Sequence, residues 1–232
     1  MKDTPVILLP GTLCTELMWK EQIKELKGIE EFQMGSLVHN SIEQMASSIL
    51  DHAPKKFAVV GFSMGGLVAL EIIRLAPERV IKLALLNTNP YPPTSSQIES
   101  WNMFIGMARN NQFMDVTEHY LLPKLLHPSC VNNLFLINKV FKMAKDVGSN
   151  TMINQMEALK KRPDNRRVLP TITCPTYILT SADDASCSPQ LQQLLAKEID
   201  GSILHTIEGC GHMLTLEKPR EVNNILREFI SQ

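Results

Sequence analysis

Residues 57–73, FAVVGFSMGGLVALEII, decide the fold. Their first four residues, FAVV, form a short apolar run typical of a buried strand. The later residues, LVALEII, have the apolar face of a helix. The change from strand to helix takes place within residues 61–66, and Ser63 lies among the glycines of that turn. So tight a turn predicts that Ser63 is held in an unfavourable backbone conformation, with its hydroxyl at the end of the strand.

Apolar runs and amphipathic stretches alternate along most of the chain. The expected strands lie near residues 5–9, 31–34, 57–61, 80–86, 175–180 and 202–207. The expected helices of the alternating part lie at 16–27, 41–53, 64–75, 189–198 and 217–231. Runs such as IKLALLN are apolar throughout, which indicates strands covered on both faces and therefore a mostly parallel sheet. The sequence predicts an α/β fold with a doubly wound sheet.

Residues 91–169 interrupt this alternation. They are rich in Met, Phe and Asn and have helical periodicity. We expect them to form a helical cap, inserted after the strand near 80–86 and lying over the carboxyl edge of the sheet. Ligands bind at that edge in open parallel sheets. Residues 1–90 and 170–232 would then form the core of the protein.

The composition excludes several classes of protein. The chain has 232 residues, 44% of them hydrophobic and 20% charged, with a formal net charge of −1, which argues against a nucleic-acid partner. No apolar run is long enough to span a membrane, and the N-terminus lacks signal-peptide features. Five scattered cysteines without C-x-x-C argue against a disulfide framework or a structural zinc site. We therefore expect a cytoplasmic protein.

Ser63 has candidate partners for nucleophilic catalysis. Residues 61–65 match G-x-S-x-G between a strand and a helix, and such a serine needs a base that is oriented by an acid. Among six histidines, His212 lies in a glycine-rich loop after a predicted strand, at the same sheet edge. Asp183 and Asp184 both follow the strand at 175–180, and adjacent side chains cannot both reach His212. The alternative is a strand–helix turn whose serine has no chemical role.

An oxyanion hole needs two backbone amides. The amide of Met64, directly after the serine, is the first expected donor. The loop after the first strand, PGTLC, provides the second, because its glycine permits a turn that faces the pocket. We expect Thr12 to be that donor, with Leu13 as the neighbouring alternative.

The chain resembles the α/β-hydrolase superfamily, in its branch of small capped serine esterases. Four segments carry the resemblance: VILLPGTLC, FAVVGFSMGGLVALE, CPTYILTSADDASCSP and IEGCGHMLTLEKP. Because the chain starts directly at the first parallel strand, the resemblance implies six to seven strands. It also implies that Asp184 is the acid of a Ser63–His212–Asp184 triad, which forms an acyl-enzyme without a metal or other cofactor.

Three positions depart from the pattern of these relatives. Ser181 stands where the family usually has glycine, and Pro10 precedes Gly11 where many relatives have histidine. The segment MGSLVHN, after the second strand, lacks the aspartate that relatives often carry. We expect the glycine of the first loop to preserve the oxyanion donor and the loop after the second strand to be arranged differently.

The cap carries the information on substrate. It contains many apolar side chains, and core packing is the competing role for each of them. We expect Trp101, Phe104 and Met107 of the cap, together with Leu13, to line a pocket for a short or medium acyl chain.

A basic segment lies near the end of the cap. Residues 139–167 contain eight basic and three acidic residues, which suits either a solvated helix face or a docking surface for an acidic acyl carrier protein. The chain resembles esterases of this branch that cleave the methyl ester of pimeloyl carrier protein, and also members that hydrolyse enol lactones.

The leading functional hypothesis is a carboxylesterase acting on a small-molecule acyl ester. The alternatives on the same triad are an acyltransferase, a perhydrolase or a C–C bond hydrolase. A non-catalytic ligand-binding protein on the same fold is the alternative from another class.

Overall fold

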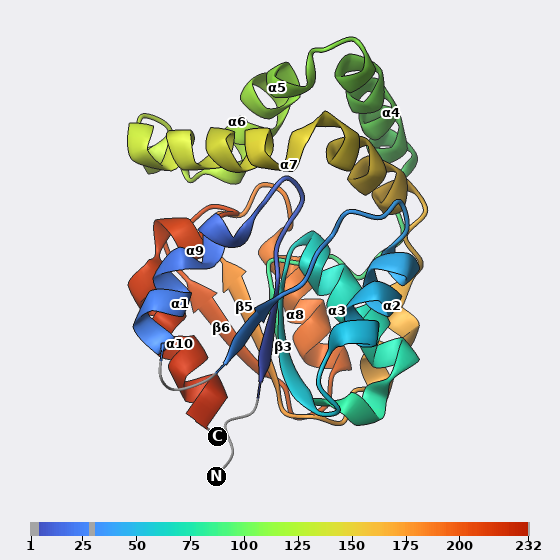
Figure 1. The fold of residues 1–232 in the computed structure, drawn as a ribbon. Coiled ribbons are helices and arrows are strands. Elements are labelled where there is room, and N and C mark those ends of the chain that lie inside the picture. The colour runs from blue at the N-terminus through green and yellow to red at the C-terminus, as the bar shows by residue number, and fades with distance from the viewer. Residues whose placement is uncertain (1–4, 28–30, 232) are drawn as a thin grey trace.

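The computed structural model describes residues 5–27 and 31–231. Residues 1–4 lie outside these ranges, and so does the part of the N-terminus in which we expect no signal-peptide features. Within them, six parallel strands form one sheet in the order β2-β1-β3-β4-β5-β6 (Figure 1). The strands are β1 (Val6–Leu9), β2 (Phe32–Met34), β3 (Phe57–Phe62), β4 (Val80–Leu86), β5 (Thr176–Ser181) and β6 (Ile203–Ile207). The prediction of a parallel sheet with six to seven strands is confirmed.

Helices cover both faces of the sheet (Figure 1). One face packs against α1 (Lys20–Leu26), α9 (Leu214–Glu217) and α10 (Pro219–Ser231). The other packs against α2 (Ile42–His52), α3 (Met64–Leu75) and α8 (Pro189–Glu198). The doubly wound arrangement is therefore confirmed.

Strand β1 shows why its sequence is apolar throughout. Successive side chains of a strand point to opposite faces. Val6 and Leu8 are buried in the cluster beneath α1 and α10, whereas Ile7 and Leu9 are buried in the cluster beneath α2 and α3. Because each face has its own hydrophobic core, no position of this strand can be polar without a buried partner.

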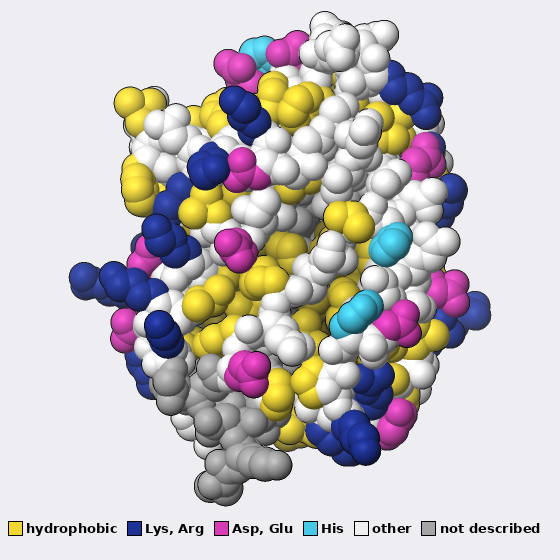
Figure 2. Space-filling model, viewed as in Figure 1, with side chains coloured by type: hydrophobic (Ala, Val, Ile, Leu, Met, Phe, Trp, Pro, Cys, Tyr) yellow, Lys and Arg dark blue, Asp and Glu magenta, His cyan; other side chains and the backbone are white. Residues whose placement is uncertain are grey.

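Helices α4 to α7 of the expected cap (residues 91–169) lie over the carboxyl ends of the strands (Figure 1). These helices are α4 (Ser95–Arg109), α5 (Phe113–Asp115), the π-helix η3 (Val116–Leu121), α6 (Leu122–Leu125) and α7 (Leu134–Lys160). Helix α7 bends at Gly148, whose φ of 78° a residue with a side chain rarely adopts. Hydrophobic side chains gather where the cap meets the loops of the sheet (Figure 2).

Two expected helices are broken. The expected helix at 16–27 starts as the 3-10 helix η1 (Glu16–Trp19) and continues as α1. The expected helix at 217–231 is divided into α9 and α10, and Pro219 begins α10, where its missing N–H is tolerated. Across residues 5–27 and 31–231, no helix combines the length and apolarity needed to cross a membrane.

Candidate active site

Ser63 lies in a strained turn between β3 and α3. Its φ of 53° and ψ of −114° fall outside the regions that ordinary residues occupy. A Cβ on Gly61 would lie 2.5 Å from the Gly65 carbonyl oxygen, and one on Gly65 would lie 2.3 Å from the Leu9 carbonyl oxygen. Both glycines of the G-x-S-x-G pattern are therefore required by contacts with backbone atoms that cannot move aside.

Ser63, His212 and Asp184 form a continuous hydrogen-bonded chain. His212 Nε2 lies 3.0 Å from Ser63 Oγ, and His212 Nδ1 lies 2.7 Å from Asp184 Oδ2. The side chains of His212 and Asp184 are buried, while Ser63 is partly exposed. The Asp184 carboxylate accepts a hydrogen bond from Nδ1–H, which places the proton of the neutral imidazole on Nδ1. The lone pair of Nε2 therefore faces the serine hydroxyl. This arrangement allows His212 to take the Ser63 proton.

The second oxygen of Asp184 is also held. Oδ1 accepts hydrogen bonds of 2.7 Å from the Ser186 amide and 2.9 Å from the Cys187 amide. These two amides fix the carboxylate plane, so that Oδ2 faces His212. Adjacent Asp183 faces the cap instead, with Oδ2 3.5 Å from His127 Nε2. The structure thus brings Asp184, and not Asp183, to the candidate base.

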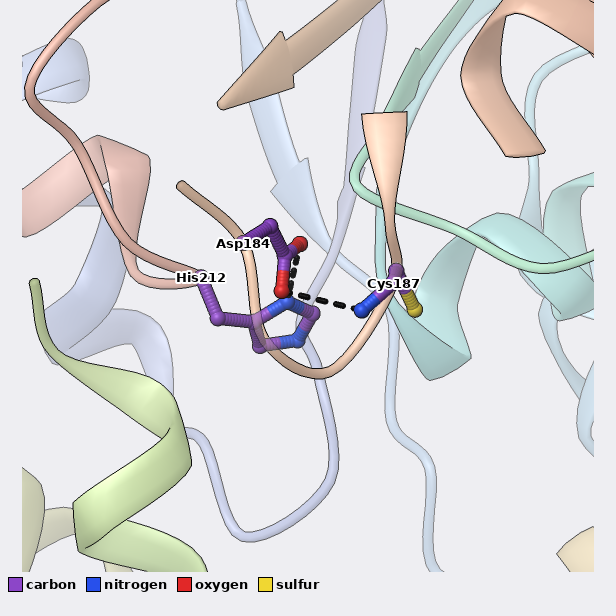
Figure 3. A group of neighbouring side chains, drawn as sticks. All are labelled: Asp184, Cys187 and His212. Carbon is purple, nitrogen blue, oxygen red and sulfur yellow. Dashed lines mark hydrogen bonds and ion pairs between the residues drawn. The ribbon is translucent and has the colours of Figure 1, made fainter. Parts of the chain in front are cut away.

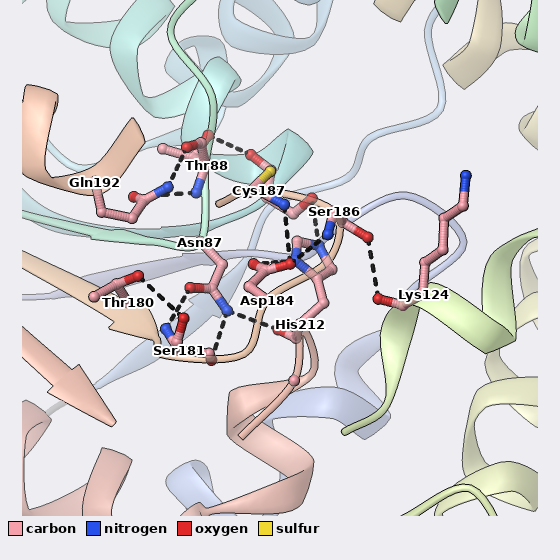
Figure 4. Close-up of polar contacts among 12 residues, drawn as sticks. Asn87, Thr88, Lys124, Thr180, Ser181, Asp184, Ser186, Cys187, Gln192 and His212 are labelled. Atoms are coloured by element: carbon pink, nitrogen blue, oxygen red, sulfur yellow. Dashed lines mark hydrogen bonds and ion pairs between the residues drawn. The ribbon is translucent and has the colours of Figure 1, made fainter. Parts of the chain in front are cut away.

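Two residues directly after β4 support the loops around the site (Figure 4). Asn87 Nδ2 donates hydrogen bonds of 2.9 Å to Ser181 Oγ and 2.9 Å to the His212 carbonyl oxygen. Thr88 Oγ1 donates one of 2.7 Å to the Ser63 carbonyl oxygen. Sequence reasoning missed both residues. The sequence feature that points to them is a pair of polar residues directly after an apolar strand, at the edge of the sheet where Ser63 also lies.

The two expected oxyanion donors are free to receive an anion. Thr12 and Met64 line the cavity beside Ser63, and no acceptor for either backbone amide exists among the described residues. The alternative donor, the Leu13 amide, already donates a 3.0 Å hydrogen bond to Gln155 Oε1. The structure therefore favours Thr12 over Leu13 as the second donor.

Gln155 ties the cap to two loops of the sheet. The buried side chain comes from α7, and its Nε2 donates a 3.0 Å hydrogen bond to the Leu37 carbonyl oxygen. Its neighbour Asn154 donates one of 2.9 Å to the Val38 carbonyl oxygen. The segment that lacks the usual aspartate is thus fastened by α7. Sequence reasoning could not find this role, because a glutamine in a long helix carries no positional signal.

A cavity of about 430 Å³ separates the cap from Ser63 and His212. Of the expected substrate-binding residues, Leu13, Trp101 and Phe104 line it. Met107 does not line it; this partly buried side chain packs against the hydrophobic cluster that joins the cap to α2 and α3. The cavity therefore has a largely apolar wall made by the cap, which also contributes Ser100 and Arg162, and a reactive end made by the loops of the sheet.

Asp184, Cys187 and His212 are close enough together to be considered as metal ligands (Figure 3). Their donor chemistry does not suit a cation in this arrangement. His212 Nδ1 and Asp184 Oδ2 already bind each other, and burial raises the pKa of the Cys187 thiol. A metal would have to break the Asp184–His212 hydrogen bond, so this cluster fits the proton-transfer arrangement better.

Four of the eight basic residues in segment 139–167 have an ion-pair partner within the segment. The paired side chains are Lys142 with Asp146, Lys160 and Lys161 with Glu157, and Arg166 with Asp164. Lys139 lies over the ring of Phe135. Arg162 is buried and lines the cavity, so it does not belong to the surface on which the docking interpretation depends.

The chain is similar to known hydrolases. The sequence model of the family described as "Alpha/beta hydrolase family" matches residues 33–225. A protein of Azorhizobium caulinodans, provisionally named a carbamate hydrolase, is 24% identical over 99% of this chain and 92% of its own length. A pimeloyl-[acyl-carrier protein] methyl ester esterase of Aromatoleum aromaticum is 22% identical over 82% of this chain and 80% of its own. For eight curated relatives, the chain spans between 62% and 92% of the relative's length.

The fold is also that of a solved esterase. The structure of a thermophilic esterase from Thermogutta terrifontis, with malate bound, superposes with a TM-score of 0.90 at 25% identity. The match covers 98% of this chain and 89% of that one.

Proposed function

Because the chain belongs to the α/β hydrolase family, we propose that it is a serine hydrolase that cleaves carboxylic esters of small or medium acyl groups. The observation that carries the proposal is the unbroken hydrogen-bonded chain from Asp184 through His212 to Ser63, at a strained turn that opens into a cavity. Esters are the class that the Aromatoleum and Thermogutta relatives are named for.

The geometry supports a two-step mechanism. His212 Nε2, 3.0 Å from Ser63 Oγ, takes the hydroxyl proton as the oxygen attacks the ester carbonyl. The amides of Thr12 and Met64 stabilise the negative oxygen of the tetrahedral intermediate. His212 then gives its proton to the leaving alcohol, which leaves an acyl-enzyme on Ser63. Water activated by His212 releases the acid, and Asp184 holds the imidazole in the required tautomer throughout.

The cellular compartment is part of the proposal. All five cysteines are free, and Cys14, Cys187 and Cys210 are buried. Burial raises the pKa of the Cys14 and Cys210 thiols to about 12, so these thiols are unreactive at neutral pH. Free thiols are typical of a reducing compartment, and this supports a cytoplasmic location.

Hydrolysis of p-nitrophenyl esters, from acetyl to dodecanoyl, tests the proposed function. We expect turnover with an optimum at short or medium chains, and we expect Ser63→Ala to remove it while the protein stays folded. Turnover that is equal in the variant would overturn the proposal. Product analysis with added methanol separates hydrolysis from acyl transfer, because a transferase would form mainly the methyl ester.

A further inference from the structure

A buried cation lies in the wall of the candidate active-site cavity. Arg162 follows α7, and only 6% of its surface is exposed. It lines the same cavity as Ser63 and His212. Cys187, the residue whose amide holds Asp184, lines the same cavity. Arg162 is therefore part of the site, although the sequence groups it with surface lysines and arginines.

Its neighbours hold the guanidinium but do not neutralise it. Nε donates a 2.8 Å hydrogen bond to the Tyr91 carbonyl oxygen. Nη2 donates to Gln97 Oε1 at 3.0 Å and to the Pro92 carbonyl oxygen at 3.5 Å. The guanidinium lies 5.2 Å from the centre of the Trp101 ring. Among the described residues, Nη1 has no acceptor and no carboxylate lies within ion-pair distance of Arg162.

This arrangement is unusual for a buried charge. Buried charged groups are normally paired, because removing an ion from water costs far more than neutral hydrogen bonds return. Burial lowers the pKa of Arg162 to about 10, and the group therefore remains positively charged at pH 7. The ring of Trp101 and three fixed acceptors hold the guanidinium plane, which prepares it to bind a planar anion.

We propose that the substrate carries a carboxylate remote from its reacting ester, and that Arg162 binds this carboxylate. The inference rests on the proposed function and names its substrate class, an anionic ester. Other polar residues line the same cavity, among them Asn89, Ser100 and the exposed Lys124. The carboxylate belongs either to the acyl part, as in a monoester of a dicarboxylic acid, or to the alcohol part, as in an ester of a hydroxy acid.

Arg162 has a competing role as a structural clamp. Its contacts with Tyr91, Pro92 and Gln97 hold the start of the cap. A clamp would stabilise the fold but would give no preference for anionic esters. Selectivity between matched charged and neutral substrates therefore separates the two roles.

The first experiment compares matched ester pairs. Monomethyl adipate against methyl hexanoate places the charge in the acyl part, and 4-acetoxybutyrate against butyl acetate places it in the alcohol part. For one pair, we expect wild-type kcat/KM to favour the anionic member at least about 10-fold. A charge-assisted hydrogen bond is worth roughly 1.5–3 kcal/mol, which converts to about 10- to 100-fold.

Variants then assign that preference. Arg162→Gln should reduce the ratio of anionic to neutral kcat/KM by about 10- to 100-fold, and Arg162→Lys should restore part of it. Exposed Arg167 is the matched control, because Arg167→Gln removes the same charge from the same segment and should keep the wild-type ratio. Equal rates for both members of both pairs in the wild type, or an equal loss on both members in Arg162→Gln, would overturn the inference.

A binding measurement keeps the inference testable if no ester is turned over. Calorimetry with Ser63→Ala should show binding of adipate or 4-hydroxybutyrate that weakens with salt, and Ser63→Ala/Arg162→Gln should lose it. Binding without hydrolysis in the wild type would contradict the esterase proposal and leave the anion site standing. Hydrolysis of neutral esters, with neither anion binding nor a preference for anionic esters, would support the esterase proposal and overturn the anion site.

Discussion

Asn87 Nδ2 hydrogen-bonds the His212 carbonyl oxygen at 2.9 Å, which ties the loop of the candidate base to the end of β4. The same side chain donates to Ser181 Oγ at 2.9 Å and accepts from the Ser181 amide at 2.9 Å. Ser181 ends the strand that leads to Asp184. One side chain therefore sets the spacing between the two loops that place His212 and Asp184. Its φ of 43° also favours asparagine.

Replacing Asn87 should damage both stability and activity. Asn87→Ala leaves the buried Ser181 amide unsatisfied and places alanine at positive φ, so we expect a loss of roughly 3 kcal/mol in the free energy of unfolding. We also expect kcat to fall about 10-fold or more, because His212 loses its support. Urea unfolding and ester kinetics measure the two effects.

Asn111→Ala is the control for Asn87→Ala. Asn111 has a φ of 61° but is exposed, and no side-chain hydrogen bond to it exists among the described residues. Asn111→Ala should therefore lower the free energy of unfolding by about 1 kcal/mol and leave the activity unchanged. Equal effects of the two substitutions would show that the Asn87 hydrogen bonds contribute nothing.

The two adjacent aspartates should behave very differently. Asp184→Asn removes the acceptor that fixes the His212 tautomer, and we expect kcat to fall roughly 10³- to 10⁴-fold. Asp183→Asn alters a partly exposed contact with His127, and we expect a change of less than about 3-fold. Steady-state kinetics of both variants, at matched thermal stability, make the comparison. A larger loss of kcat in Asp183→Asn than in Asp184→Asn would contradict this assignment and identify Asp183 as the acid.

Two glycines offer opposite outcomes for the same change. In Gly65→Ala, the new Cβ would lie 2.3 Å from the Leu9 carbonyl oxygen, and we expect a loss of more than about 3 kcal/mol in the free energy of unfolding. In Gly106→Ala, the new Cβ meets open space within α4, and we expect a gain of about 0.5–1 kcal/mol. Urea unfolding of both variants measures the difference. A well-folded Gly65→Ala protein would contradict the close approach of α3 to β1.

Gln155 should act on kcat more than on KM. Gln155→Leu removes the acceptor of the Leu13 amide, which follows the proposed oxyanion donor Thr12, and we expect kcat to fall about 10-fold. Asn154→Ala, one residue earlier, removes an exposed bond to the Val38 carbonyl oxygen and should leave kcat within about 2-fold. A rise in KM alone in Gln155→Leu would assign Gln155 to substrate binding instead.

The sheet and the candidate roles of Ser63 and His212 could be predicted because each has a local cause in the sequence. Apolar runs predict strands buried on both faces, and the glycines at 61 and 65 are imposed by backbone contacts within a short segment. The choice between Asp183 and Asp184 came from a family pattern, since adjacent carboxylates look alike in a sequence. In the structure, that choice depends on the amides of Ser186 and Cys187.

The remaining features depend on contacts between distant segments. Gln155 meets Leu13 across 142 residues, and Asn87 meets His212 across 125. Arg162 illustrates the same limit, because in a run of basic residues nothing marks the one side chain that turns inward. Met107, which we expect in the cavity, instead lies partly buried against the hydrophobic cluster, since an apolar residue of the cap suits either place. Such pairings are fixed by tertiary packing and not by local pattern.

The central claim is that Ser63 becomes acylated, and trapping of the acyl-enzyme tests it most directly. The protein is mixed with an ester whose acyl group is hydrolysed slowly from the enzyme, then digested and analysed by mass spectrometry, beside Ser63→Ala. We predict one adduct, on the peptide that contains Ser63, and no adduct in the variant. A folded protein that forms no adduct, or forms it equally in Ser63→Ala, would contradict the account.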